Sequence, residues 1–192
     1  MLKENKGKLL FSSLLILLPI LIGNYAMPIL MLILHWFCLL FTSFDLKNKN
    51  QTKKVQHMVF WICPCISLFA NGLSYALTTH SNIDTSQITP AFFGLLFIWI
   101  GNYLPKCKQN STIGIKILWA LKNEENWNYT HRIGGKIWVC SGFLMLCSLF
   151  LPDNFKMMVF LLALLLAVVI PAVCSYLYYR KQKAEGTYFK NT

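Results

Sequence analysis

The stretch FKMMVFLLALLLAVVIPAVCSYLYY, residues 155–179, decides what kind of protein this chain forms. It runs for 25 residues, and Lys156 is its only charged side chain. A membrane-spanning helix needs about 20 mainly apolar residues, because each residue advances about 1.5 Å and the hydrocarbon layer is about 30 Å thick. The stretch therefore predicts a helix that crosses a membrane.

Five more apolar runs precede this stretch. The six predicted spans are Leu9–Gly23, Ala26–Phe44, Met58–Leu77, Pro90–Leu104, Ile137–Leu151 and Phe155–Tyr179. Three of them contain only 15 residues, so flanking residues or local thinning of the bilayer must complete the crossing. The first two runs are joined by little more than Asn24 and Tyr25, and a bent or re-entrant hairpin is the alternative for this pair.

These runs predict an all-α fold, a polytopic transmembrane helical bundle of about six helices. Residues 1–192 are expected to form a single integral-membrane domain, with residues 9–54 as the first helix pair. Residues 9–22 also resemble a signal peptide, but no small-x-small cleavage site follows, so we expect this segment to remain as an anchor.

The composition excludes two broad classes of protein. Apolar residues make up 56% of the chain and charged residues 13%, whereas soluble globular chains carry about 25% charged residues. A disordered chain would need low hydrophobicity and high charge. The net charge of +11 is typical of nucleic-acid or membrane proteins, but the basic residues lie between hydrophobic runs. We therefore expect a lipid bilayer as partner and no direct contact with nucleic acid.

The positions of the basic residues predict the topology. Of 18 basic residues, 17 lie in the N-terminal segment, the second and fourth loops and the C-terminal tail, and Lys156 is the exception. Lysine and arginine accumulate in cytoplasmic loops of membrane proteins. Both termini are therefore predicted to be cytoplasmic, with an even number of crossings.

Few polar side chains interrupt the apolar runs. His35, Asn71 and Asn102 are the candidates to bind a ligand or line a passage, although such residues more often form interhelical hydrogen bonds. Glu124, Glu125 and His131 only faintly suggest an enzyme, because no second histidine or nucleophile completes the set. The sequence has no HExxH, GxSxG or glycine-rich phosphate loop, so no catalytic residue, cofactor or metal is predicted.

The fourth loop, residues 101–136, differs from the rest of the chain. It reads GNYLPKCKQNSTIGIKILWALKNEENWNYTHRIGGK and is polar, aromatic and cationic. Asn123 is expected to cap a short helix that Gly134 terminates. Residues 113–121 are apolar beside lysines and are expected to lie along the inner leaflet. A solvated connector is the alternative to a cytoplasmic docking or sensing surface.

Two parts of this loop resemble the signature of the SdpI-type immunity proteins, which are bacterial multispanning membrane proteins. The two similar stretches of the loop are GNYLPKCKQNSTIGIK at 101–116 and LKNEENWNYTHRIGGK at 121–136. Outside the loop, LLPILIG at 17–23, residues 35–54 and FANG at 69–72 also resemble the family. The chain departs from the family at Ile117-Leu118, where Thr-Pro is usual, and at its short Asn24–Tyr25 connection.

The resemblance implies a multi-pass protein of the bacterial cytoplasmic membrane that is not an enzyme. It implies resistance to a secreted, membrane-active peptide toxin, and signalling in which a cytoplasmic transcriptional repressor is held at the membrane. A transporter or exporter of a peptide or ion is the first alternative, and a membrane-embedded enzyme is the weaker one. The signature residues, expected to serve loop shape, helix capping and partner contact, are Asn102, Pro105, Gly114, Trp119, Glu125, Trp127, Thr130, His131, Arg132, Gly134 and Gly135.

Overall fold

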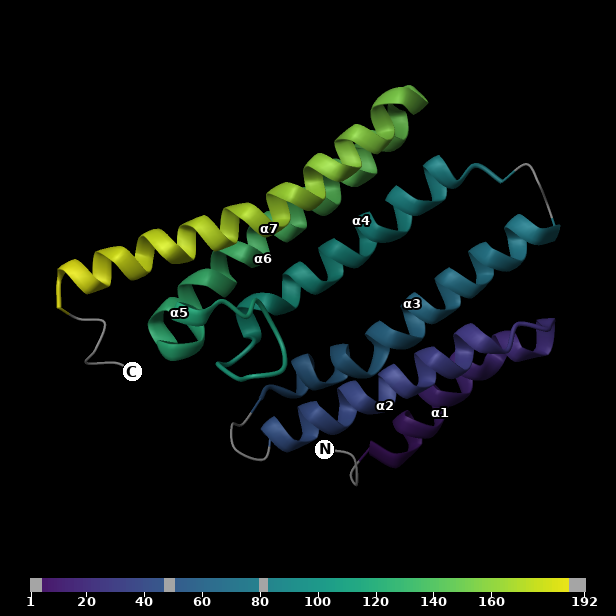
Figure 1. Cartoon of the computed structure of the whole chain (residues 1–192), viewed down its shortest axis with the longest axis horizontal. Helices are drawn as coiled ribbons and strands as arrows, with labels where there is room; N and C mark the ends of the chain where they lie inside the picture. Colours follow the sequence, from purple (N-terminus) through teal and green to yellow (C-terminus); the bar gives the residue numbers. More distant parts are fainter. Residues whose placement is uncertain (1–4, 47–50, 80–82, 187–192) are drawn as a thin grey trace. The chain divides into compact units, whose positions relative to one another are not determined.

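The computed structural model describes residues 5–46, 51–79 and 83–186, and all regular structure in these ranges is helical (Figure 1). The elements are α1 (Lys6–Leu17), η2 (Leu18–Ile22), α2 (Ala26–Leu46), α3 (Lys53–Thr79), α4 (Thr85–Tyr103), η3 (Leu104–Lys106), α5 (Leu118–Lys122), α6 (Glu124–Cys147), η4 (Ser148–Phe150) and α7 (Asp153–Ala184), where η marks a 3-10 helix. The predicted all-α helical fold is confirmed. Part of the segment 35–54, on which the family resemblance draws, lies outside the described residues.

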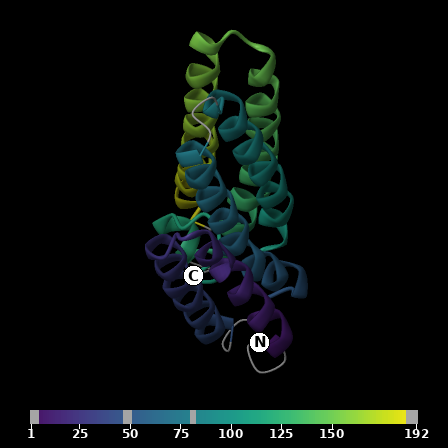
Figure 2. The same cartoon turned by 90° about the vertical axis from the view of Figure 1, so that its right-hand side faces the viewer.

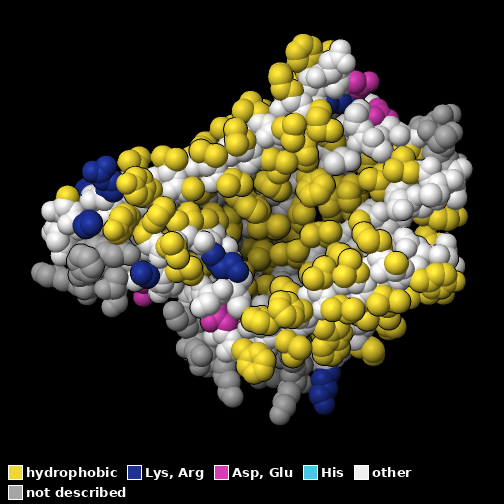
Figure 3. All heavy atoms as spheres, viewed as in Figure 1, with side chains coloured by type: hydrophobic (Ala, Val, Ile, Leu, Met, Phe, Trp, Pro, Cys, Tyr) yellow, Lys and Arg dark blue, Asp and Glu magenta, His cyan; other side chains and the backbone are white. Residues whose placement is uncertain are grey.

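Among the residues that the structure describes, five helices are long and apolar enough to cross a membrane. They cover Ala26–Asp45, Lys53–Thr79, Thr85–Lys106, Glu124–Phe150 and Asp153–Ala184. Apolar side chains remain open on their outer surfaces, among them Leu161, Leu165 and Val168 at 55%, 59% and 66% exposure. Hydrophobic side chains cover much of the face drawn in Figure 3, and surface of this kind in a folded chain requires lipid or protein to cover it.

The first predicted span is the one that does not form a long helix. Its α-helical part has 12 residues and gives way to η2 at Pro19, which has no backbone N–H to continue the α-helical pattern. Gly23 ends η2 with φ of 83°, a left-handed conformation that glycine adopts without strain. The structure therefore favours the bent alternative for the first helix pair.

The two short predicted spans in the second half of the chain are longer than the sequence suggested. α4 begins at Thr85, where the Asp84 carboxylate accepts a hydrogen bond from the Ser86 backbone N–H at 2.9 Å. α6 begins at Glu124 and continues to Cys147, so the prediction of a helix end at Gly134 is wrong. Gly134 and Gly135 lie inside α6 and do not end it. Neighbouring residues pack so closely against them that only small residues fit there.

The chain divides into two compact units, Met1–Ile83 and Asp84–Thr192. The first contains α1, α2 and α3. Within it, the Asn24 amide donates to Asn71 Oδ1 at 2.8 Å, which ties the turn before α2 to α3. Ser12 Oγ and His35 Nε2 lie 3.0 Å apart and join α1 to α2.

The second unit contains α4, α6 and α7, which run alongside one another (Figures 1 and 2). Glycines bring the backbones of α4 and α6 together at two levels. A Cβ on Gly94 would lie 2.9 Å from the carbonyl oxygen of Gly142, and a Cβ on Gly101 would lie 2.9 Å from that of Gly135. Real Cβ atoms essentially never approach so closely, so these positions admit glycine alone without a shift of the helices.

α7 packs against α6 through a carbonyl that a proline leaves free. Pro171 lies inside α7 and cannot donate to the carbonyl four residues earlier, which belongs to Ala167. The Trp138 indole N–H of α6 donates to this carbonyl at 3.1 Å. The proline thus creates an acceptor that the neighbouring helix satisfies.

Lys156, the basic residue that departs from the predicted charge distribution, lies in the first turn of α7. The Lys156 ammonium is buried and lies 2.7 Å from Asp153 Oδ1, so its charge is paired within the first turn of α7. Nearby, the Ser86 hydroxyl donates to the Asp84 carboxylate at 2.5 Å and is the main cause of a lowered pKa at Asp84. The exception at Lys156 therefore contributes little net charge on this side.

Candidate functional site

The segment between η3 and α5 is a folded loop organised around Asn110. The buried Asn110 side chain accepts hydrogen bonds from the backbone N–H groups of Thr112 and Ile113, at 2.8 and 2.6 Å. Its amide donates to the carbonyl oxygens of Lys108 and Ile113, at 2.7 and 3.0 Å. A single side chain thus satisfies four backbone groups and holds the loop in one conformation.

Trp127 and His131 of α6 fasten this loop to the helix. Their rings stack with centroids 4.0 Å apart, and both side chains are fully buried. The Trp127 indole N–H donates to the Cys107 carbonyl at 2.9 Å. The Ile115 backbone N–H donates to His131 Nε2 at 3.0 Å, and Nδ1 lies 2.9 Å from the Trp127 carbonyl. Because Nε2 accepts, the proton belongs on Nδ1 and the imidazole is neutral.

Gly114 makes this contact possible. Its φ is 115°, and a Cβ there would collide with His131 Nε2. Gly134 has a related role, since a Cβ on it would collide with the Ile115 side chain. Both glycines allow the loop to approach α6 closely.

Trp119 of α5 joins a second buried network between α6 and α7. Its indole N–H donates to Ser175 Oγ at 2.8 Å, and Ser175 Oγ donates to Asn126 Oδ1 at 2.7 Å. Asn126 Oδ1 also accepts from Thr130 Oγ1 at 3.0 Å, and the Asn126 amide donates to the Ser175 carbonyl at 3.1 Å. All donors of the network have acceptors, so it stiffens the unit without leaving an unsatisfied group.

The apolar residues 113–121 do not lie as a free strip along a leaflet within this unit. Ile115 packs onto Gly134 of α6, and Trp119 stacks on Tyr179 of α7 at a centroid distance of 6.0 Å. Ala120 is fully buried, whereas Leu118 is 71% exposed. Because the loop has polar anchors at Asn110 and His131, its apolar side chains are used to pack it onto the two helices.

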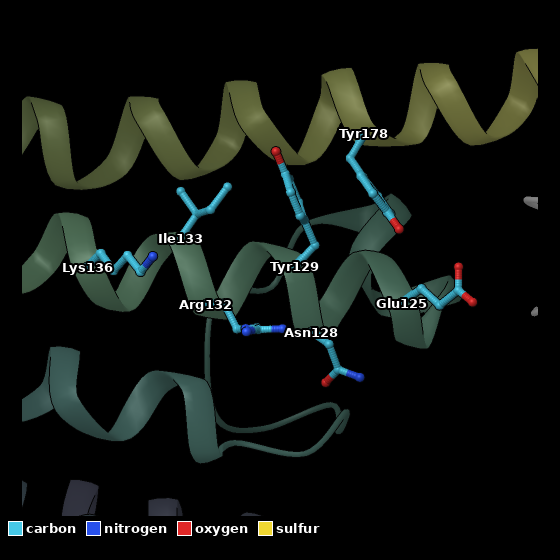
Figure 4. Close-up of a pocket in the computed structure, with 7 residues that line it drawn as sticks. All are labelled: Glu125, Asn128, Tyr129, Arg132, Ile133, Lys136 and Tyr178. Atoms are coloured by element: carbon cyan, nitrogen blue, oxygen red, sulfur yellow. The ribbon is translucent and has the colours of Figure 1, made fainter.

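The signature residues therefore separate into buried supports and an exposed face. Trp127, Thr130, His131, Gly134 and Gly135 are buried. The exposed members include Glu125 and Arg132, which line an open pocket of about 440 Å³ beside Asn128, Tyr129, Ile133, Lys136 and Tyr178 (Figure 4). Asn102 and Pro105 line a second hollow of about 430 Å³, together with Lys136.

The pocket of Figure 4 combines charged and aromatic walls. Tyr129 of α6 and Tyr178 of α7 stack at 4.3 Å and close one side. The Glu125 carboxylate accepts from Gln182 Nε2 at 2.8 Å. Arg132 and Lys136 lie one turn apart on α6, and within the described ranges neither forms a hydrogen bond or ion pair. The pocket thus offers two available cations.

The intramembrane polar candidates have separate partners. His35 meets Ser12, and Asn71 both accepts from Asn24 and donates to the Ser67 carbonyl at 2.8 Å. Asn102 belongs to the second unit, where its amide donates to the Ile98 carbonyl at 2.8 Å. Each of these contacts is of the interhelical or intrahelical kind that fixes helices.

The residues considered for an enzyme do not form one site. His131 is fully buried and bonded to the loop, whereas Glu124 and Glu125 are exposed at the start of α6. Within residues 5–46, 51–79 and 83–186, no three His, Cys, Asp or Glu side chains are grouped to hold a metal ion. Glu124, Glu125 and His131 therefore do not come together as one acid–base set.

Sequence reasoning missed several residues on which the site depends. Asn110 lies in the pattern N-S-T-I-G, whose asparagine followed by small polar residues and glycine is a turn signal. Asn126 and Ser175 are separated by 49 residues, so no local pattern connects them. Gly94 and Gly142 could have been found, since each lies seven residues from another glycine, Gly101 and Gly135 respectively, along an apolar helix.

Comparison with known proteins agrees with the sequence resemblance. The model of the SdpI/YfhL protein family matches residues 106–178, which run from the end of η3 to Tyr178 of α7. The protein named Immunity protein SdpI, from Bacillus subtilis (strain 168), is 28% identical over 158 residues, which are 82% of this chain and 74% of that protein. No solved structure matches the chain. The loop, the buried networks and the pocket all lie in or beside the matched segment, and both comparisons support a likeness to the SdpI/YfhL protein family.

Proposed function

We propose that this chain is a membrane immunity protein that gives resistance to a secreted, membrane-active peptide toxin. The observation that carries the proposal is the likeness to Immunity protein SdpI over 82% of the chain, joined with helices suited to a membrane. The family match covers the loop and α6, where an open pocket is lined by charged and aromatic side chains. The proposed mode of action is binding of a toxin or a partner, without chemical conversion of either.

We further propose that the pocket face of α6 acts as a cytoplasmic contact surface, to which a transcriptional repressor binds when toxin is present. Buried Asn110, Trp127 and His131 hold the loop and α6 as one rigid support. The exposed side chain of Asn128 stands on this support and is available to a partner. A stable support with an exposed polar face is what a docking surface requires.

The test of immunity is survival of a toxin-sensitive bacterium that expresses the full chain. The panel of secreted membrane-active peptides includes any toxin encoded beside the gene. We expect survival above that of the empty vector. Equal survival, with the protein present in the membrane at normal abundance, would refute the immunity proposal.

Exposed residues separate signalling from folding better than buried ones do. We expect N128A to leave abundance and survival near wild type while weakening repressor retention at the membrane, measured by fractionation of a tagged repressor. The matched control is K108A, which also removes an exposed polar side chain of the second unit but lies outside the pocket. Normal retention in N128A would exclude this face as the docking surface.

A further inference from the structure

The exposed face of α6 changes character at one level of the helix. Towards the N-terminal end, the exposed positions on one side are Glu125, Asn128, Arg132 and Lys136. Beyond Lys136 the exposed positions become Cys140, Phe143 and Cys147, with Phe143 at 55% exposure. A change from charged to apolar side chains on a helix surface marks the passage from headgroups to hydrocarbon. Arg132 and Lys136 therefore lie at headgroup depth.

The two neighbouring helices place the same boundary beside them. On α4, Trp99 and Tyr103 stand before Lys106, whose ammonium lies 5.0 Å from the Tyr103 ring centroid. On α7, the tyrosines at 176, 178 and 179 stand directly before Arg180 and Lys181. Tyrosine and tryptophan collect at membrane interfaces, and cations collect at the cytoplasmic one. The residues typical of a membrane interface on α4, α6 and α7 thus lie at the level of the pocket.

The pocket at this level carries two cations and has room for a phosphate together with further headgroup atoms. It measures about 440 Å³ and opens to the surface, with Arg132 and Lys136 along α6 and Tyr178 on α7 (Figure 4). Among the described residues neither cation has an ion-pair partner. Glu125 in the same lining accepts from the neutral Gln182 amide and keeps its negative charge, so the two cations leave the lining with a formal charge of +1. A guanidinium and an ammonium one helical turn apart can bind different oxygens of one phosphate.

We propose that this pocket binds the phosphate of an anionic phospholipid, whose acyl chains continue along the apolar side of α6 past Cys140 and Phe143. A lipid is favoured over a soluble anion because the apolar surface begins directly beside Lys136. Basic pockets between helices at the cytoplasmic face of membranes bind lipid headgroups of this kind. The lipid would fill the space between α6 and the end of α7 and hold the contact face at a fixed depth.

The experiment is native mass spectrometry of the full chain, extracted from vesicles that contain equal amounts of phosphatidylglycerol and phosphatidylcholine. We expect the wild type to retain phosphatidylglycerol in preference to phosphatidylcholine, and R132Q/K136Q to lose this preference by roughly tenfold. R132K/K136R keeps both charges and is expected to retain most of it. K108Q/K116Q removes the same charge outside the pocket and is expected to behave as wild type.

Three outcomes would overturn the proposal. Equal retention of the two lipids by the wild type, or an equal loss in R132Q/K136Q and K108Q/K116Q, would show that the pocket has no selective lipid site. Displacement of the lipid by millimolar inorganic phosphate would show a site for soluble anions instead. The assay needs neither toxin nor repressor, so its result is independent of the proposed immunity function.

Discussion

Gly114 shows how much of the candidate site depends on a single backbone conformation. Its positive φ turns the loop so that the next residue, Ile115, donates its N–H to His131 Nε2. The ring of Trp127 lies close on the same side, 3.2 Å from where a Cβ on Gly114 would be. The hydrogen bond, the stacked rings and the glycine form one connected contact between loop and helix.

G114A is expected to lower the free energy of unfolding by about 3 kcal/mol, because it combines an unfavourable φ with a collision against His131. The measurement is denaturant unfolding of the purified chain in detergent. G72A is the matched control, since Gly72 lies in α3 with open space around its Cβ position, and alanine is a better helix former there. Equal stability of the two variants would contradict the close contact at Gly114.

At the scale of the element, α6 and α7 are joined by polar contacts that prolines and small residues permit. Pro171 leaves the Ala167 carbonyl free for Trp138, and Ser175 one turn later joins Asn126 and Trp119. In an apolar surrounding, such satisfied contacts fix which side of a helix faces its neighbour. The helices are therefore positioned by a few specific bonds, as well as by apolar packing.

The bond to Ala167 predicts a coupling between Trp138 and Pro171. W138F is expected to cost about 1–3 kcal/mol, because it leaves a buried carbonyl without a donor. In a P171A background the new N–H of residue 171 can satisfy that carbonyl, so the same change should cost about 1 kcal/mol less. A double-mutant cycle from unfolding free energies measures this difference. W99F, at an indole without a hydrogen bond among the described residues, should show no coupling.

At the scale of the whole molecule, the family match and the predicted membrane topology both concern the second unit. The family match at 106–178 lies entirely within Asp84–Thr192. The candidate span Glu124–Phe150 separates the loop end of this unit from the turn at Pro152. The charge distribution of the sequence predicts that the loop end is cytoplasmic.

This topology predicts opposite accessibility of two engineered cysteines. K108C should react with a membrane-impermeant maleimide only after cells are permeabilised, whereas P152C should react in intact cells. Both positions are exposed, and the wild-type chain provides the background labelling. Labelling of the two variants from the same side would contradict a crossing by α6.

Much of the fold could be predicted because apolar runs and helix caps are local signals. Asn123 does cap a helix, accepting from the Asn126 N–H at 2.9 Å, as its neighbours suggested. Gly134 and Gly135 misled the prediction because two adjacent glycines usually mark a helix end. Their true role depends on Ile115, Pro105 and Gly101, which only the folded chain brings near. Likewise, the resemblance identified Trp119 and Thr130, but their common partners Ser175 and Asn126 are tertiary contacts.

The paired glycines of α4 and α6 restrict the number of residues between them as well as the residue type at each position. On each helix the two glycines of these contacts lie seven residues apart, a distance of about 10.5 Å, so the two antiparallel helices match at both levels or at neither. A single residue inserted between Gly94 and Gly101 would rotate one glycine away by about 100° and place a side chain against the opposite backbone. We expect deep insertion scanning to find these two seven-residue intervals intolerant, and relatives to differ in length elsewhere.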